Sequence, residues 1–179
     1  MSRRATLRDL LQAYTPSDSM EEAHKAAMLT LLDVEGDPFG RGHFVPGHFT
    51  ASSFVLSPDG GSLLLIYHGK LHRWLQPGGH VDPEDEDIFQ AAKREVAEET
   101  GKADLTPVGG IFDLDVHVIP ARKADPAHSH FDVRVLFKSE SLDFQAGSDA
   151  KDARWVKLGD ISQVESDASV MRAVGKLLK

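Results

Sequence analysis

The chain has 179 residues, of which 41% are hydrophobic, and a formal net charge of -8 at pH 7. This length and composition suit one compact domain with a sizeable core. The negative charge argues against a general nucleic-acid or anionic-membrane surface. Because the chain has no cysteine, disulfides and thiolate metal sites are excluded, and any metal must be held by oxygen or nitrogen ligands.

The first 35 residues are predicted to form a helical extension, residues 1–35. Three leucines between positions 7 and 11 share one helical face, and Pro16 ends this run. Ser19 and Glu22 have the spacing of a capping box, which predicts a second helix reaching about Leu32. The extension either forms a homodimer contact or covers a pocket as a lid, and both alternatives stay open.

Neither a membrane span nor a signal peptide is indicated. The chain contains no run of about 18 apolar residues, and Arg8 and Asp9 interrupt the N-terminal leucines. We therefore expect a cytoplasmic protein with a small-molecule partner.

Residues 36–179 are predicted to form one α+β domain. Residues 36–49 form a loop rich in Gly, Pro and His, and the apolar runs 49–57 and 62–68 are strands joined by the hairpin signal PDGG. The later segments are a short strand at 73–76, a helix over about 84–100, strands at 106–119, 129–137 and 153–158, and a helix from about 167. This order predicts a mixed sheet covered by helices on both sides.

The helix over about 84–100 carries carboxylates that repel one another unless a cation is present. Glu95, Glu98 and Glu99 fall within about a third of the helix circumference, so they can converge on one point. The adjoining apolar stripe consists of Ile88, Ala92 and Val96. Carboxylates at the edge of a core are costly to ionise together, and a hard divalent cation such as Mg²⁺ or Mn²⁺ relieves that cost.

A solvated surface helix is the plainer interpretation of the same glutamates. Arg94 and Glu98 have the i,i+4 spacing of an ordinary surface ion pair. Gly78 and Gly79 favour the metal site instead, because consecutive glycines before a helix permit a close backbone approach.

This helix and its preceding glycines resemble the signature of the Nudix hydrolases: a glycine, five residues, Glu, seven residues, then Arg-Glu-aliphatic-x-Glu-Glu-x-Gly-aliphatic. The matching residues are Gly79, Arg94, Glu95, Val96, Glu98, Glu99 and Gly101. The first half is one residue longer than the family pattern. Counting forward from Gly79 places the first acidic residue at Asp85. Counting back from Arg94 places it at Glu86, and both stay open. Lys102 occupies a position that is usually aliphatic in the family, which affects packing at the helix exit.

The resemblance extends more loosely over residues 49–178. It implies a Nudix-like α/β/α sandwich with a mixed sheet, and residues 36–179 as its catalytic domain. It implies hydrolysis of a diphosphate linkage in a nucleoside diphosphate derivative or a related phosphorylated small molecule, with Mg²⁺ or Mn²⁺ as cofactor. The implied metal ligands are Glu95, Glu98, Glu99 and the backbone carbonyl of Gly78, and the implied catalytic residues include Glu95 and Glu98. Arg94 is expected to orient the carboxylates, with a direct phosphate contact as the alternative.

A further carboxylate is expected in a late loop. Many family members carry one about six residues before a tryptophan, and counting back from Trp155 gives Asp149. Asp149 is our candidate for an additional ligand or a general base, and Asp152 is the alternative in the same loop. An ordinary turn-forming Asp in a Gly-Ser loop explains Asp149 equally well.

Basic side chains near the glycines are candidates for substrate binding. Lys70, His72 and Arg73 lie shortly before Gly78 and either contact the substrate or form a solvated loop. Trp74 either stacks on a base or packs in the core.

The segment HSHFD places His128 and His130 on one face of a strand, with Asp132 beyond them. Such a pair binds a transition metal, contacts phosphate or makes ordinary hydrogen bonds, and His130 is our further candidate for substrate binding. His43 and His48 receive no role.

Two other functions fit parts of this pattern. Isomerisation of an isoprenoid diphosphate is supported by the same fold, but it usually needs a catalytic cysteine, which this chain lacks. A non-catalytic nucleotide-sensing module would be expected to lose carboxylates of the signature, and all three ligand glutamates are present. Nucleoside triphosphates, nucleotide sugars, dinucleoside polyphosphates and coenzyme A derivatives stay open as substrates. The proline-spaced pattern of the ADP-ribose branch is not seen, which lowers ADP-ribose.

Overall fold

The computed structural model describes residues 2–122, 124–145 and 152–179, which form four α-helices, a 3-10 helix and one seven-stranded sheet. The helices are α1 (Arg3–Ala13), α2 (Ser19–Leu31), α3 (Ile88–Thr100), the 3-10 helix (Leu158–Gln163) and α4 (Ala168–Leu177). The strands are β1 (Gly47–Leu56), β2 (Ser62–His68), β3 (Arg73–Leu75), β4 (Gly78–His80), β5 (Leu105–Ile119), β6 (His128–Ser139) and β7 (Ala153–Lys157).

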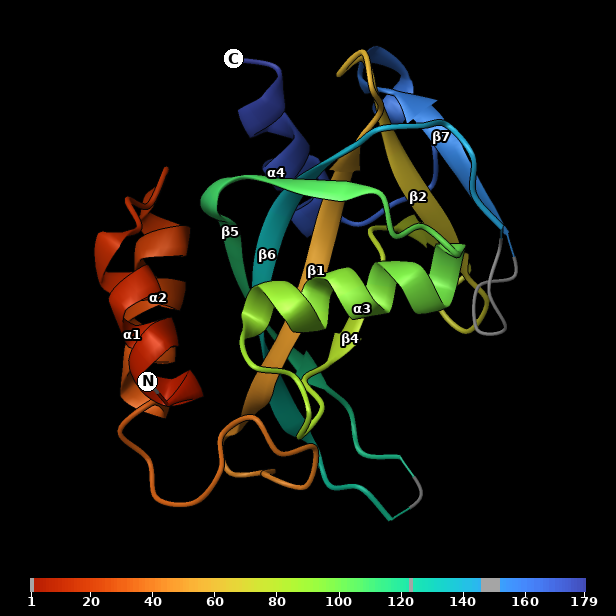
Figure 1. Cartoon of the computed structure of the whole chain (residues 1–179). Coiled ribbons are helices and arrows are strands. Elements are labelled where there is room, and N and C mark those ends of the chain that lie inside the picture. The colour runs from red at the N-terminus through yellow and green to blue at the C-terminus, as the bar shows by residue number, and fades with distance from the viewer. Residues whose placement is uncertain (1, 123, 146–151) are drawn as a thin grey trace.

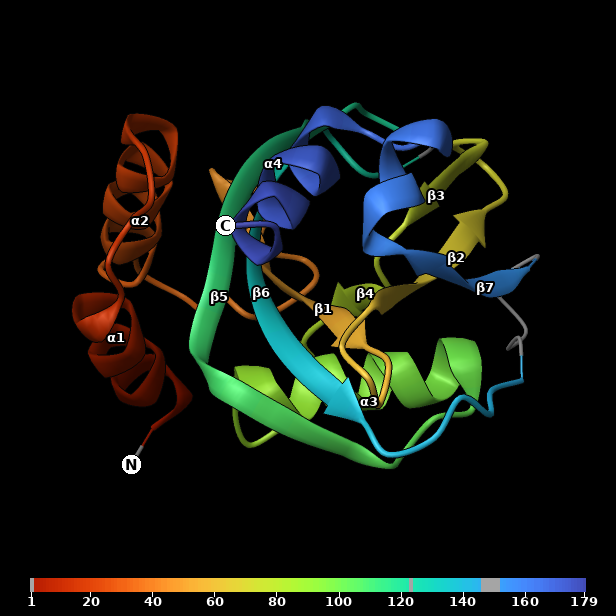
Figure 2. The same ribbon diagram turned by 90° about the horizontal axis from the view of Figure 1, so that it is seen from above.

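The sheet is mixed and is covered on both faces. Its order is β3-β2-β1-β6-β5, with β4 paired to β1 and β7 paired to β2. β1 and β6 run parallel, whereas the other strand pairs run antiparallel. Helix α3 crosses one face and α4 lies on the other, while α1 and α2 stand outside β5 (Figures 1 and 2). The predicted α/β/α sandwich with an N-terminal helical extension is confirmed.

Strand β1 is the centre of the fold because its alternate side chains serve different layers. Phe49, Ala51 and Val55 are buried in the core that also contains the predicted apolar stripe of α3. On the other face, Phe54 is buried in the core that includes Val170 of α4. The N-terminal half of that second face is polar instead, with His48, Thr50 and Ser52. A polar patch is thus buried beside an apolar core.

Helix α3 begins at Ile88, four residues later than the predicted start, and this prediction was wrong for a local reason. The Asp87 side chain caps the helix by accepting a hydrogen bond from the Gln90 backbone N–H at 2.9 Å. Gly101 adopts the left-handed conformation (φ 66°) and ends the helix as predicted. Helix α2 likewise begins after an Asp18 cap, so the Ser19 capping box was wrong.

Strand β4 was not predicted, because only three residues, two of them glycine, form it. Its backbone pairs antiparallel with β1, with Gly78 opposite Ser52 and His80 opposite Thr50. This pairing brings the glycines before α3 to the middle of the sheet.

The N-terminal extension shares the hydrophobic core of the domain. Leu7, Leu11 and Met28 are buried in the same cluster as the α3 face of the sheet. Glu21 of α2 is fully buried and accepts hydrogen bonds from Lys176 of α4 and from the Leu114 backbone N–H of β5. The extension is therefore attached to the domain by both apolar and charged contacts. The boundary at residue 35 and the role as a dimer contact or lid stay predictions.

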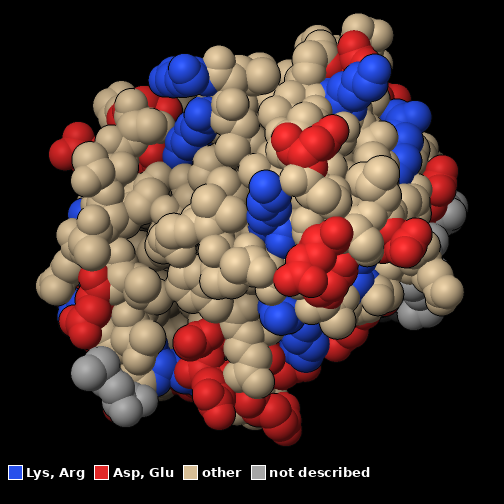
Figure 3. Space-filling view, turned by 45° about the horizontal axis from the view of Figure 1, so that its top comes forward, with Lys and Arg blue, Asp and Glu red and all other residues tan. Residues whose placement is uncertain are grey.

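Charge is distributed in small groups on the face shown in Figure 3, where Lys and Arg lie interspersed with Asp and Glu around a largely uncharged centre.

Within the described ranges, no helix has the length and apolar character needed to cross a membrane.

Candidate functional site

The C-terminal half of α3 faces β4 across a very short gap. A Cβ atom on Gly79 would lie 2.7 Å from the carboxylate atoms of Glu95, which is closer than real Cβ contacts. The Gly78 backbone N–H donates to Glu99 Oε2 at 2.9 Å. The carboxylates of Glu95 and Glu99 thus rest against the backbone of β4, and Gly79 is the residue that leaves room for Glu95.

Gly78 is required by the sheet itself. A Cβ atom there would lie 2.3 Å from the Ser52 Cβ and 2.6 Å from the Ser52 Cα of the paired strand. The two glycines therefore solve different steric problems, one toward β1 and one toward α3. This is the physical reason for the close approach that the sequence predicted.

Arg94 is the hub of the charged groups around α3. Its guanidinium donates to Asp85 (Nη2–Oδ2 2.9 Å), Glu95 (Nη1–Oε1 3.0 Å) and Glu98 (Nη1–Oε1 3.1 Å). It also donates to the His80 backbone carbonyl at 2.8 Å. Hydrogen bonding to Asp85 is the main cause that raises the pKa of Arg94 above its usual range. Arg94 is thus placed to orient carboxylates. We call Arg94, its partners Asp85, Glu95 and Glu98, and the nearby Glu99 on the same helix the box cluster.

The extra residue of the signature is accommodated in the turn before α3. Asp85 is 4% exposed and faces Arg94, and its Oδ2 also accepts the Asp82 backbone N–H at 2.8 Å. Glu86 is exposed. Of the two open alternatives, Asp85 therefore holds the buried position beside the arginine.

Burial makes the charge of Glu95 costly. Its side chain is 14% exposed, and desolvation raises its pKa, against the opposing effect of Arg94. Glu98, by contrast, is 58% exposed on its side chain. The single positive charge of Arg94 is therefore shared between a buried and an exposed glutamate.

A second polar region lies on the other face of the sheet, where three strands are in register. The rows run across β1, β6 and β5, and they are His48–His130–His117, Thr50–Asp132–Asp115 and Ser52–Arg134–Asp113. The Ser52 hydroxyl donates to Asp132 at 2.7 Å and accepts from Gln76 Nε2 at 3.3 Å. The rows therefore start on β1, which pairs with β4, and the third row ends at Asp113, which accepts a hydrogen bond from Arg172 of α4.

In the second and third rows, carboxylates lie close to positively charged side chains. We call this set the buried network, and it consists of Glu21, Asp113, Asp115, Asp132, Arg134, Arg172 and Lys176. Arg134 is 2% exposed and lies 2.8 Å from Asp132 and 3.2 Å from Asp113. Burial raises the pKa of Asp115, but the hydrogen bond from His117 and the charge of Arg134 outweigh burial and hold that pKa at about 2.

The first row is made of imidazoles. His80 joins it from β4, with its ring 5.2 Å from that of His48 and 5.3 Å from that of His130, centroid to centroid. Burial lowers the pKa of His80 to about 4 and that of His130 to about 3, so both rings are neutral at pH 7. The prediction that His128 and His130 share one face is confirmed, since their rings lie 5.2 Å apart. The sequence missed His48 as their neighbour.

The other predicted substrate residues lie elsewhere. Lys70, His72 and Arg73 are all exposed around the connection between β2 and β3. β2 and β1 separate this edge of the sheet from β6 and His130. The structure therefore does not gather the four predicted substrate contacts in one place.

Of three further predicted residues, two have simple surroundings and one lies outside the described residues. Trp74 is half-buried, with the Arg154 guanidinium 3.9 Å from its ring centre. Asp152 is exposed, and its side chain accepts the Ala153 backbone N–H at 2.8 Å at the start of β7. Asp149 lies outside the described residues.

The family is decided by comparison with known proteins. Residues 47–177 match the model of the NUDIX domain. The chain belongs to the Nudix family. Together with the hydrolases among its structural relatives, this match makes the protein a Nudix hydrolase. Comparison with curated proteins gives no significant match.

Several solved Nudix structures share the fold of this hydrolase. The C. elegans Ap4A hydrolase in a binary complex is 25% identical, with a TM-score of 0.53 over 73% of this chain and 96% of that one. The E. coli dihydroneopterin triphosphate pyrophosphohydrolase is 17% identical, with a TM-score of 0.59 over 72% and 92%. The NUDIX domain of Shewanella oneidensis NrtR, complexed with ADP ribose, is 18% identical, with a TM-score of 0.51 over 94% of each chain.

Proposed function

We propose that this Nudix hydrolase is a metal-dependent pyrophosphohydrolase. Its substrate would be a nucleoside diphosphate derivative or a related phosphorylated small molecule, and its cofactor Mg²⁺ or Mn²⁺. The observation that carries the proposal is the packing of the Glu95 and Glu99 carboxylates on the backbone of Gly78 and Gly79. This packing brings two acidic side chains and the backbone of two consecutive glycines to one place.

The residues present suit a hard divalent cation. The proposed ligands are Glu95, Glu98, Glu99 and the carbonyl of Gly78, which supply only oxygen atoms, as Mg²⁺ and Mn²⁺ prefer. The raised pKa of Glu95 shows that its negative charge is poorly solvated, so a cation there would stabilise the ionised form. When bound, such an ion supplies electrostatic stabilisation of the charge on phosphate oxygens and of the leaving group.

The protein side chains have separate tasks in this proposal. Arg94 holds Glu95 and Glu98 in position, and Asp85 fixes the guanidinium from the opposite side. Glu98 is the most exposed of the four carboxylates within ion-pair distance of Arg94, so it is accessible to accept a proton from water. Asp149 stays our candidate for an additional ligand or general base, with Asp152 as the alternative.

Substrate contacts are proposed from the β2–β3 edge of the sheet and from β6. Lys70, His72 and Arg73 are exposed and free to meet a charged or nucleotide group, and His130 lies beside β4 through His80. The likeness to the Ap4A hydrolase at 25% identity supports placing dinucleoside polyphosphates first among the substrates to test.

The test is phosphate and pyrophosphate release from nucleoside triphosphates, nucleotide sugars, dinucleoside polyphosphates and coenzyme A derivatives, each with Mg²⁺, Mn²⁺ or EDTA. The wild type is compared with Glu98→Gln and with Glu22→Gln, a control at an exposed glutamate of α2. We expect turnover that EDTA and Glu98→Gln abolish and that Glu22→Gln leaves intact. Thermal stabilisation by a nucleotide without turnover of any compound would instead identify a sensing module.

A further inference from the structure

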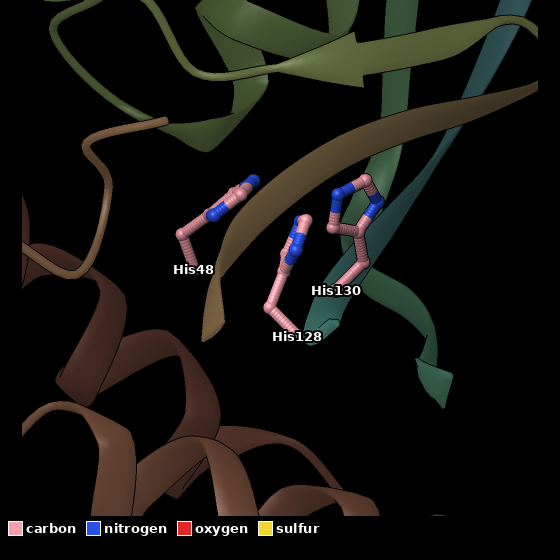
Figure 4. A group of neighbouring side chains, drawn as sticks. All are labelled: His48, His128 and His130. Carbon is pink, nitrogen blue, oxygen red and sulfur yellow. The ribbon is translucent and has the colours of Figure 1, made fainter. Parts of the chain in front are cut away.

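Three histidines far apart in the sequence meet at the beginning of β1 and β6. His48, His128 and His130 each offer one ring nitrogen, and these three atoms lie within 4.8 Å of one another. Figure 4 shows the imidazoles gathered in one place, with His48 coming from β1 and the other two from β6. Within the described part of the chain, no other group of three or more His, Asp or Glu side chains meets this spacing.

Hydrogen bonds fix the tautomer of two of these rings. His48 Nδ1 lies 3.2 Å from the His43 carbonyl, and His128 Nδ1 lies 2.8 Å from the Pro126 carbonyl. A carbonyl oxygen can only accept, so in each ring Nδ1 carries the proton and Nε2 keeps its lone pair. A backbone carbonyl that orients the second ring nitrogen is the usual partner of a metal-ligating histidine.

The lone pair of His48 has no partner of its own. His48 is 0% exposed, and its Nε2 is buried without a hydrogen bond among the residues that the structure describes. Buried polar atoms in proteins are nearly always satisfied, so this acceptor points to a group that binds there. Because Nε2 carries a lone pair and no hydrogen, the group that would bind there is a cation or a hydrogen-bond donor.

We propose that His48, His128 and His130 form a binding site for a divalent transition-metal ion such as Zn²⁺. Imidazole nitrogens are ligands of borderline softness and suit Zn²⁺, Co²⁺, Ni²⁺ or Cu²⁺, whereas Mg²⁺ and Ca²⁺ prefer oxygen. Nitrogens around a tetrahedral ion at about 2.0–2.1 Å would be about 3.4 Å apart, so small rotations of the rings close the site. Three protein ligands leave a fourth position open for water or another ligand.

This site is separate in chemistry from the box cluster but adjacent to it. His80 lies between the two, because its ring contacts those of His48 and His130 while its carbonyl accepts from Arg94. The inference does not depend on hydrolysis, since it rests on the histidines alone.

The experiment is titration of metal-free protein with Co²⁺ and Zn²⁺ in the presence of excess Mg²⁺, which occupies oxygen-rich sites. Absorption of the Co²⁺ ion reports its ligands, because tetrahedral nitrogen coordination gives intense visible bands and octahedral oxygen coordination gives weak ones. Calorimetry with Zn²⁺ gives the stoichiometry. We expect one equivalent of tightly bound ion with the intense Co²⁺ spectrum.

Four variants test where the ion binds. His48→Gln and the less buried His130→Gln should each weaken Zn²⁺ binding by at least about tenfold and remove the Co²⁺ bands. His68→Gln, at the end of β2, and Glu98→Gln should keep both. If His48→Gln does not fold, Zn²⁺ binding and the Co²⁺ bands of His130→Gln test the site. Absence of saturable binding in the wild type, or binding that Glu98→Gln removes and the histidine variants retain, would overturn the proposal.

Discussion

The box cluster and the buried network treat their carboxylates in different ways. In the buried network, four carboxylates are matched by three cations, namely Arg134, Arg172 and Lys176. In the box cluster, the single guanidinium of Arg94 is shared among Asp85, Glu95 and Glu98, with Asp82 at 3.6 Å, and Glu98 is largely exposed. Removing one partner from a buried ion pair is strongly destabilising, whereas carboxylates that share one cation keep negative charge that a ligand can bind. This difference supports a structural role for the first cluster and the catalytic role that we propose for the second.

The largest effect is expected when the central cation of the buried network is removed. Arg134→Met leaves three neighbouring aspartates buried without that cation, and we expect a loss of about 3–5 kcal/mol in the free energy of unfolding. Urea denaturation measures it. The control is Arg8→Met, whose exposed ion pair with Asp33 (2.7 Å) should contribute about 0–1 kcal/mol. Equal effects of the two variants would show that the buried network is not structural.

Acid should weaken the buried network in a defined pH window. Asp115 has a pKa of about 2 in the folded protein against about 3.9 when unfolded. Its contribution is therefore complete above about pH 4 and is lost as the pH falls through about 2, and it amounts to about 2–3 kcal/mol. Asp115→Asn should show a correspondingly shallower fall of unfolding free energy between these pH values. Parallel curves for wild type and variant would contradict the assignment.

Asp85 and Glu86 are adjacent acidic residues that differ in their contact with Arg94 of the box cluster. Asp85→Asn removes the buried partner of Arg94, so Glu95 and Glu98 lose their fixed orientation, and we expect roughly a 10–100-fold loss of turnover. Glu86→Gln, one residue further along the chain and exposed, should change turnover by less than about twofold. Steady-state kinetics on the substrate that the release assay identifies separate the two variants. The opposite ranking would place the acidic residue of the signature at Glu86.

The sequence predicted the grouping of the three glutamates of the box cluster because they lie close together on one helix. Glu95, Glu98 and Glu99 share a face through helical periodicity alone, and Gly101 ends the helix through its own conformational freedom. The choice between Asp85 and Glu86 could not be made, because it depends on how the turn before α3 folds. Strand β4 was missed for a related reason, since its partner β1 defines it.

The histidine site and the buried network were not predictable in the same way. Their residues meet through the parallel register of β1 with β6, which puts His48 opposite His130, and nothing in the local pattern specifies that register. The spacing of His128 and His130 revealed one edge of the site. The ion pairs of Arg134 could not be predicted. Alternation of polar and apolar residues in β5 and β6 shows that the polar side chains share a face, but it does not show which element packs on that face.

The central claim is that the box cluster binds a cation in order to cleave a diphosphate, and the most direct test is turnover as a function of free Mg²⁺. For the wild type we predict saturable activation by Mg²⁺ from a metal-free rate near zero. For Glu98→Gln we predict turnover lower by about 100-fold or more at every Mg²⁺ concentration, with the folded protein at least as stable without metal, because one like charge is gone. Turnover that is independent of Mg²⁺, or a stable Glu98→Gln variant with wild-type activation, would contradict the account.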